Sequence, residues 1–192
     1  MIDSLVRPHI TSKMDIFALK LSQSGLSPNK LTYIGFAFGF AGCFFVGMQM
    51  YPLGLLLILI ALVFDGLDGA VARATQSTEL GAWLDMMSSV ILFAMFPFFF
   101  MLSQTEHSMG AGILLFTYLL MGMANLSYDY FAMKRGAPPA KSGLVESGEI
   151  IIFIVLSCLY PPGFSFFAAA LAIMNLAAAI IRMTLTYKLL KN

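Results

Sequence analysis

The sequence predicts an all-α integral membrane protein with six transmembrane helices, preceded by an amphipathic helix at the membrane surface. Of the 192 residues, 59% are hydrophobic and only 11% are charged. Apolar stretches of about 20 residues, the length that a helix needs to cross a bilayer, alternate with short polar loops. Pro52, Pro161 and Gly163 mark breaks between these stretches.

The expected membrane spans follow one another along most of the chain. They are Leu31–Met50, Leu53–Arg73, Gly81–Ser103, Gly110–Met133, Ser147–Tyr160 and Phe164–Tyr187. The fifth is short unless residues 143–147 extend it. We therefore expect residues 1–26 to form an N-terminal segment on the cytoplasmic surface and residues 27–192 to form one six-helix membrane domain. Cys43 and Cys158 lie in apolar stretches without metal-ligand spacing, so we expect small core side chains there.

The N-terminal segment has an amphipathic pattern rather than a continuous apolar core. Residues 12–22 place Met14, Phe17 and Leu21 on one helical face, with Asp15 elsewhere. This pattern predicts a helix that lies on the cytoplasmic membrane surface. The alternative is a helix that packs on the membrane bundle. The interruption of the apolar residues by acidic ones argues against a signal peptide.

The basic residues indicate the orientation in the membrane. All of them lie in segments that the six-span topology places on one side: Arg7, Lys13, Lys20, Lys30, Arg73, Lys134, Arg135, Lys141, Arg182, Lys188 and Lys191. The three loops expected on the other side carry no Lys or Arg. By the positive-inside rule, both chain ends face the cytoplasm, and we expect a prokaryotic cell membrane.

Three aspartates, Asp65, Asp68 and Asp85, lie inside or at the edge of the apolar spans. A carboxylate in the hydrocarbon region is costly unless it is paired, bound to a metal or exposed to water. Asp65 and Asp68 are three residues apart and share a helical face. Asp85 lies at a similar depth in the next span. Carboxylates in this number suit Mg²⁺ or Mn²⁺, so the sequence predicts a divalent-metal and phosphate site on the cytoplasmic side.

Small and basic residues surround the aspartates at fixed spacing. The pattern is Asp65-x2-Asp68-Gly69-x2-Ala72-Arg73-x7-Gly81-x3-Asp85. Gly69 and Gly81 would let a nucleotide approach the helix backbone, and Ala72 keeps the wall of the site low. Arg73 offers a planar fork of donors that suits phosphate. The alternative for the small residues is a seam for helix packing.

This pattern closely resembles the signature of the CDP-alcohol phosphotransferase family, D-x2-D-G-x2-A-R-x7–8-G-x3-D-x3-D. Every fixed position matches except the last, where Ser89 stands in place of aspartate. Upstream, Pro28-Asn29-Lys30-Leu31-Thr32 is similar to the family's P-N-x-L/I-T element, which lies near the nucleotide in relatives. Asn29 also fits a simple helix cap. The resemblance covers residues 27–190.

The resemblance implies a specific reaction. The family transfers a substituted phosphate from a CDP-linked donor, commonly CDP-diacylglycerol, to an alcohol, releases CMP and makes phospholipids. It implies that Asp65, Asp68 and Asp85 bind two Mg²⁺ or Mn²⁺ ions. It also implies a CDP pocket lined by Asn29, Thr32, Gly69, Ala72, Arg73 and Gly81. Relatives are homodimers. The net charge of +1 gives no indication of nucleic-acid binding.

Ser89 occupies the position of the family's catalytic base. A neutral hydroxyl is a poor proton acceptor, and general-base catalysis contributes roughly 10²–10⁴-fold to a rate. Three explanations for Ser89 remain open. It is an engineered change, or it marks a natural paralogue that holds a CDP-lipid or metal without turnover. Otherwise another carboxylate takes the role of the missing aspartate. Candidates for that carboxylate are Glu146, Glu149 and Asp129, although Glu146 also fits a charge at a helix N-terminus. A cation channel is disfavoured because the carboxylates cluster on one side of the membrane.

The acceptor alcohol is the least defined part of the hypothesis. Lys134, Arg135 and Lys141 either hold a phosphorylated acceptor or anchor their loop at the membrane surface. Glu146 and Glu149 point instead to a polyol or a cationic acceptor. Arg182 either extends to the membrane surface or contacts a phosphate.

Overall fold

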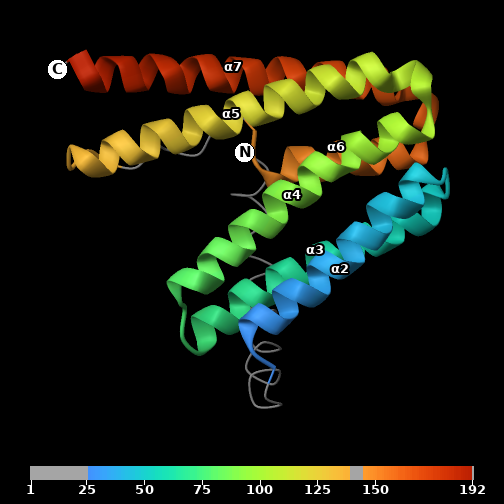
Figure 1. The fold of residues 1–192 in the computed structure, drawn as a ribbon, viewed down its shortest axis with the longest axis horizontal. Helices are drawn as coiled ribbons and strands as arrows, with labels where there is room; N and C mark the ends of the chain where they lie inside the picture. Colours follow the sequence, from blue (N-terminus) through green and yellow to red (C-terminus); the bar gives the residue numbers. More distant parts are fainter. Residues whose placement is uncertain (1–25, 139–144, 192) are drawn as a thin grey trace. The chain divides into compact units, whose positions relative to one another are not determined.

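The computed structural model describes residues 26–138 and 145–191, and all the regular elements in these ranges are helices. These residues form two compact units, one of residues 26–104 and one of residues 105–138 and 145–191 (Figure 1). The all-α prediction is confirmed for the described residues. The predicted surface helix, residues 12–22, lies outside them.

Five helices in the described residues are long and apolar enough to cross a membrane. They are α2 (Pro28–Gly47), α3 (Tyr51–Ala74), α4 (Glu79–Ser103), α5 (Ser108–Lys134) and α7 (Phe164–Lys191). The sixth, α6 (Ser147–Leu159), has 13 residues. At 1.5 Å per residue it extends about 20 Å, short of a hydrocarbon core of about 30 Å. The structure thus supports an integral membrane protein with five such helices, and the predicted count of six is not confirmed.

In the first unit, α2 and α3 form an antiparallel hairpin, and α2 also packs against α4 (Figure 1). The backbones of α2 and α3 approach closely because glycines face each other. A Cβ on Gly42 would lie 2.8 Å from the carbonyl oxygen of Gly54. Small residues permit this kind of close helix contact in membranes. The hairpin places the start of α2 beside the end of α3, where the aspartates lie.

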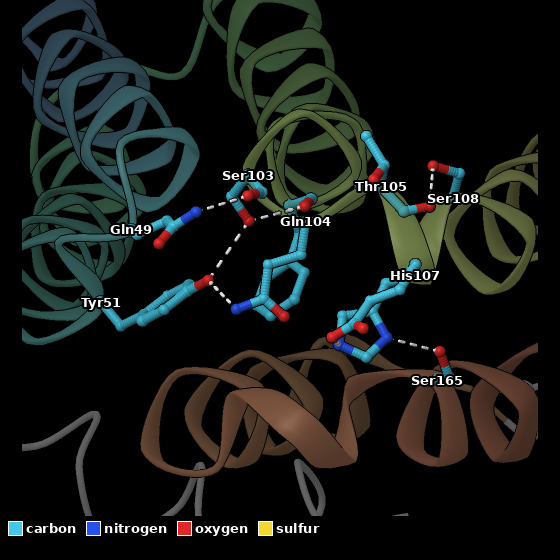
Figure 2. A network of polar contacts seen from close by, with 10 residues as sticks. Gln49, Tyr51, Ser103, Gln104, Thr105, His107, Ser108 and Ser165 are labelled. Atoms are coloured by element: carbon cyan, nitrogen blue, oxygen red, sulfur yellow. Dashed lines mark hydrogen bonds and ion pairs between the residues drawn. The ribbon is translucent and has the colours of Figure 1, made fainter.

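The turn end of this hairpin carries a cluster of four polar side chains, here called the turn cluster: Gln49, Tyr51, Ser103 and Gln104 (Figure 2). Gln104 Nε2 donates to the Tyr51 hydroxyl at 2.8 Å, and that hydroxyl lies 3.3 Å from Ser103 Oγ. Ser103 Oγ donates to a carbonyl of its own helix, so Tyr51 is the donor toward Ser103. The turn cluster thus joins the start of α3 to the end of α4.

Gln49 adopts a left-handed backbone conformation in the turn between α2 and α3, with φ of 63°. For a residue with a Cβ this conformation costs roughly 1–2 kcal/mol. The Gln49 side chain donates from Nε2 to the Ser103 carbonyl oxygen at 2.7 Å. That carbonyl belongs to the last turn of α4, which has no helical donor for it. The hydrogen bond therefore offsets part of the backbone strain.

In the second unit, α5 and α7 lie side by side and run parallel (Figure 1). Near their starts, the Nδ1 atom of His107 lies 2.7 Å from Ser165 Oγ (Figure 2). Near their ends, Arg135 donates to the carbonyl oxygens of Leu189 and Leu190. Contacts at both ends fix the register of the pair. Cys43 in the first unit and Cys158 in the second are buried free thiols, which confirms their expected roles as core side chains.

Candidate active site

A cavity of about 300 Å³ opens at the aspartate end of the first unit. Its walls come from the start of α2, the end of α3, the loop that follows and the start of α4. They are Ser27, Pro28, Asn29, Thr32, Asp68, Gly69, Ala72, Gln76, Ser77, Thr78, Gly81, Ala82 and Asp85. Small-molecule sites begin at about this volume. Seven residues predicted from the sequence thus line one cavity: Asn29, Thr32, Asp68, Gly69, Ala72, Gly81 and Asp85.

Asp68 is the most buried of the three aspartates, with 2% of its surface exposed. Thr32 on α2 donates a hydrogen bond from its hydroxyl to Oδ2 of this carboxylate. The other oxygen, Oδ1, is buried and has no hydrogen-bond partner among the described residues. A buried carboxylate oxygen without a partner is energetically costly, so this atom is suited to a cation that enters the cavity.

Asp65 and Asp85 lie next to each other, with their carboxyl groups within hydrogen-bonding reach. Ser89 Oγ donates to Asp65 Oδ1 at 2.9 Å, so the residue at the position of the family's base lies directly against the aspartates. A second cavity of about 10 Å³ lies here, lined by Thr32, Asp65, Asp68, Ser88 and Ser89 together with apolar residues. This volume is close to that needed by one water molecule.

The donor set fits a hard divalent cation. Three carboxylates within reach of one another repel unless a cation or hydrogen bonds neutralise them, and carboxylate oxygen is the ligand that Mg²⁺ and Mn²⁺ prefer. In the described residues, no three His, Cys, Asp or Glu side chains lie in an arrangement that could hold a metal ion as it stands, so the three aspartates would have to move closer together around a cation. The Asp68 Oδ1 atom is the observation that favours a cation. Asp68 Oδ2 accepts a hydrogen bond from the Thr32 hydroxyl, and Asp65 Oδ1 accepts one from the Ser89 hydroxyl.

The two glycines of the pattern differ in their surroundings. A Cβ on Gly81 would lie 3.0 Å from Asn29 Oδ1 and 3.1 Å from Thr78 Oγ1, so two polar side chains converge over this position. A Cβ on Gly69 would meet only Arg73 Nη1, at 3.4 Å. The Arg73 guanidinium thus lies close to Gly69, although Arg73 does not line the cavity. Gly69 leaves helix backbone open toward the cavity.

The residues predicted for the site did not include the loop between α3 and α4 or the second serine of the small cavity. These residues are Gln76, Ser77, Thr78 and Ser88. Thr78 carried a usable signal, because a threonine just before a helical apolar run is a typical N-cap. Its Oγ1 accepts a hydrogen bond from the Gly81 amide at 3.0 Å. Gln76 and Ser77 carried none, since the path of a loop is not encoded by periodicity.

A family model for CDP-alcohol phosphatidyltransferase matches residues 26–187. The chain belongs to this family. Inner membrane protein YnjF of Escherichia coli (strain K12) is 33% identical over 175 residues, which are 86% of this chain and 85% of that protein. Archaetidylinositol phosphate synthase of Pyrococcus horikoshii is 28% identical over 167 residues, 82% of each chain. The predicted family is therefore confirmed.

Solved structures share the fold at lower sequence identity. Phosphatidylinositol phosphate synthase (PgsA1) of Mycobacterium tuberculosis with CDP-DAG bound has a TM-score of 0.71 and 22% identity, over 91% of this chain and 93% of that one. The same protein in complex with manganese and citrate has a TM-score of 0.70 and 21% identity, over 91% of this chain and 88% of that one. At this identity the likeness concerns the fold.

The remaining residues predicted for this CDP-alcohol phosphatidyltransferase lie in the second unit. Glu146 and Glu149 form a capping box at the start of α6, in which the Glu149 carboxylate accepts from the Glu146 amide at 3.0 Å. This is the helix-terminal role that the sequence offered as the alternative for Glu146. Asp129, on α5, is exposed. Their roles as substitutes for the missing base stay predictions.

Two basic residues of the second unit, Arg135 and Arg182, also have structural partners, whereas Lys134 is exposed. Arg135 donates from Nη1 and Nη2 to the carbonyl oxygens of Leu189 and Leu190 in the last turn of α7, at 2.6 and 3.1 Å. This use as a helix cap favours the anchoring role over acceptor binding. Arg182 Nε donates to Asn125 Oδ1 at 2.8 Å, and its guanidinium lies 5.7 Å from the centre of the Tyr128 ring. Lys141 lies outside the described residues.

Proposed function

We propose that this chain transfers a substituted phosphate from CDP-diacylglycerol to an alcohol in phospholipid synthesis, with CMP as the leaving group. The observation that carries the proposal is the cavity at the aspartate end, where the carboxylates of Asp68 and Asp85 meet polar groups of α2 and the loop before α4. Asp65 lines the smaller cavity beside it, together with Asp68. Membership of the CDP-alcohol phosphatidyltransferase family supports the reaction class. The CDP-DAG complex of the mycobacterial synthase, which shares the fold, supports this donor.

The residues divide into two groups. Asp65, Asp68 and Asp85 would hold one or two Mg²⁺ or Mn²⁺ ions, and the manganese complex of the mycobacterial synthase supports a divalent metal. Bound ions would neutralise the pyrophosphate and stabilise the leaving CMP. The CDP pocket consists of Asn29, Gly69, Ala72, Arg73 and Gly81. Thr32, which the resemblance also placed there, donates its hydroxyl to Asp68 and is assigned to that carboxylate instead. The helix backbone left open at Gly69 gives the donor room, and the Arg73 guanidinium beside it suits a phosphate.

The transfer proceeds by in-line attack. The alcohol oxygen forms a bond to the β-phosphorus of the donor, and the bond between this phosphorus and the bridging oxygen breaks. CMP leaves with the bridging oxygen, and the proton of the alcohol passes to a base. Ser89 supplies no carboxylate for that proton, so we infer a slow reaction. Glu146, Glu149 and Asp129 stay the candidates for a compensating base.

The second candidate function is a non-catalytic protein of the same fold that holds a CDP-lipid and metal without turnover. Ser89 favours this function. At the position where the family has a fourth carboxylate, it presents a hydroxyl that donates to Asp65 Oδ1 and cannot serve as a base. Such a protein would bind CDP in the presence of Mn²⁺ and release no CMP with any acceptor.

We further propose that the site faces the cytoplasm of a prokaryotic cell. The one-sided distribution of Lys and Arg supports this orientation, and bacterial and archaeal relatives support the source. The homodimer implied by the resemblance stays a prediction, which the mass of the protein in detergent would test.

The test is CMP release from CDP-diacylglycerol with Mg²⁺ or Mn²⁺ and a panel of alcohols, for this chain and for Asp68→Asn. We expect slow, metal-dependent release with one class of acceptor, and a further drop in Asp68→Asn. Release that is equal in both proteins would contradict the proposed site. Metal-dependent CDP binding without release by any acceptor would favour the non-catalytic function.

A further inference from the structure

Thr32 and Asp68 form a buried polar pair between α2 and α3. Thr32 is 6% exposed and Asp68 is 2% exposed. The Thr32 hydroxyl donates to Oδ2 of Asp68, although the Pro28 carbonyl oxygen of its own helix lies 3.2 Å away as a competing acceptor. A hydroxyl has one proton, so donation to the carboxylate gives the stronger, charge-assisted bond. The pair therefore links the two helices beneath the cavity.

The bond leaves the two oxygens of Asp68 in different states. Oδ2 has the threonine hydroxyl, whereas Oδ1 is buried without a hydrogen-bond partner among the described residues. A carboxylate that rotates freely would exchange its oxygens. One that is held at Oδ2 keeps Oδ1 in a fixed direction. Thr32 also lines both cavities of the site. Its hydroxyl therefore connects the Asp68 carboxylate on α3 to the backbone of α2.

The surroundings of Thr32 restrict its movement. Its β-branched side chain has few rotamers available within a helix. One turn along α2, a Cβ on Gly35 would lie 2.9 Å from Phe64 Cβ and 3.3 Å from the Ala61 carbonyl oxygen, so α2 and α3 are in tight contact. The position of the hydroxyl relative to Asp68 is thus set by the packing of the two helices.

We propose that Thr32 is a positioning residue that orients Asp68 for a divalent cation, instead of a direct contact for the nucleotide. The proposal rests on the proposed function, because it takes Asp68 as a metal ligand. Hydrogen-bond partners of metal ligands commonly change metal affinity by about 10–100-fold when they are removed. Thr32 would act on the metal through Asp68 and would leave the CDP contacts unchanged.

The test compares Thr32→Val, which keeps the shape and removes the hydroxyl, with Thr32→Ser, which keeps the hydroxyl. Mn²⁺ binding to the purified full-length protein is measured by the electron paramagnetic resonance signal of free Mn²⁺. CDP binding is measured by calorimetry at saturating Mn²⁺. Thr117→Val is the matched control, because Thr117 is a buried threonine of α5 whose hydroxyl bonds only to carbonyl oxygens of its own helix in the described residues.

We expect Thr32→Val to weaken Mn²⁺ binding about 10–100-fold while CDP affinity at saturating Mn²⁺ stays within about twofold of the parent. Thr32→Ser and Thr117→Val should bind Mn²⁺ as the parent does. In an Asp68→Asn background, Thr32→Val should cause no additional loss, because its effect passes through that carboxylate. This double variant also separates positioning from a general loss of folding.

Three outcomes would overturn the positioning role. One is unchanged Mn²⁺ binding in Thr32→Val with a large loss of CDP affinity, which would make Thr32 a nucleotide contact. Another is an equal loss in Thr32→Val and Thr32→Ser. The third is a loss in Asp68→Asn that Thr32→Val increases further. If the parent chain binds neither Mn²⁺ nor CDP, the proposed function itself fails, so the two failures are distinguishable.

Discussion

At one end of the α2–α4 unit, four polar side chains hydrogen-bond to one another or to helix carbonyl oxygens, whereas at the other end a buried carboxylate oxygen has no protein partner among the described residues. In the turn cluster, hydrogen bonds run from Gln104 through Tyr51 to Ser103 (Figure 2). At the aspartate end, Asp68 lines a cavity, and its Oδ1 atom is buried without a hydrogen-bond partner among the described residues. Both groups belong to the unit formed by α2, α3, α4 and their turns. The difference suggests a criterion. Polar residues with a structural role have their hydrogen bonds satisfied within the protein, whereas residues suited to a ligand keep buried polar atoms without a protein partner.

The contrast extends to charge. The turn cluster consists of amides and hydroxyls, which lose little when hydrogen bonds replace water. The aspartate end gathers three acidic side chains, and like charges at close range destabilise the fold unless a cation offsets them. A purely structural role would be met better by neutral groups. The charge at this end is therefore an argument for function.

The largest effect is expected from Ser89→Asp, which completes the family's pattern. The substitution places a proton acceptor beside Asp65, and we expect CMP release to rise roughly 10²–10⁴-fold. A fourth carboxylate should also lower thermal stability without divalent metal, with recovery on addition of Mn²⁺. The measurement is CMP release and melting temperature with and without Mn²⁺.

Ser89→Asn is the control for this prediction, because it has the shape of aspartate and does not accept a proton. It should stay near the parent rate. Equal rates for the parent, Ser89→Asp and Ser89→Asn would show that the base lies elsewhere. Glu146, Glu149 and Asp129 would then be the next positions to change.

Gly81→Ala should have a smaller effect on the cavity wall. Its Cβ would press on Asn29 Oδ1 and Thr78 Oγ1, at 3.0 and 3.1 Å. Overpacking of this kind costs roughly 1–3 kcal/mol, so we expect CDP affinity to fall by about tenfold. Calorimetric titration with CDP measures it. Gly122→Ala is the control, since a Cβ there meets nothing within 4 Å, and an equal loss in the control would refute a local cause.

The smallest effect is expected from Tyr51→Phe in the turn cluster. It removes a hydroxyl that accepts from Gln104 and lies against Ser103. The cost should be about 1 kcal/mol of unfolding free energy, typical of one hydrogen bond. Thermal unfolding in detergent checks this value. The affinities for Mn²⁺ and CDP should stay at the parent level. A change in either affinity would contradict the assignment of the turn cluster to a purely structural role.

The aspartate site could be proposed from the sequence because its residues are close in the chain and have fixed spacing. Asp65 and Asp68 are three residues apart on α3 and share a helical face, and a short loop leads from α3 to Asp85 near the start of α4. The Thr32–Asp68 bond could not be predicted, because its members are 36 positions apart and their contact depends on how α2 crosses α3. The turn cluster was missed for the same reason.

The predicted spans were close to the helices observed, since apolar length is a strong signal in membrane proteins. The short span predicted at Ser147–Tyr160 also matches α6, Ser147–Leu159, but this helix has only 13 residues and its crossing of the membrane is not confirmed. Its capping box at Glu146 and Glu149 fixes the start at Ser147. A hydropathy pattern does not reveal such a cap. The capping-box pattern of side chains reveals it only after the start of the helix is known.

The most direct test of the contrast between the two ends is Mn²⁺ binding to the parent chain, Asp68→Asn and Tyr51→Phe, followed by the resonance signal of free Mn²⁺. We predict that the parent and Tyr51→Phe bind Mn²⁺ with equal affinity and that Asp68→Asn loses at least tenfold. Equal binding by all three proteins would contradict the assignment of the aspartate end as the ligand site.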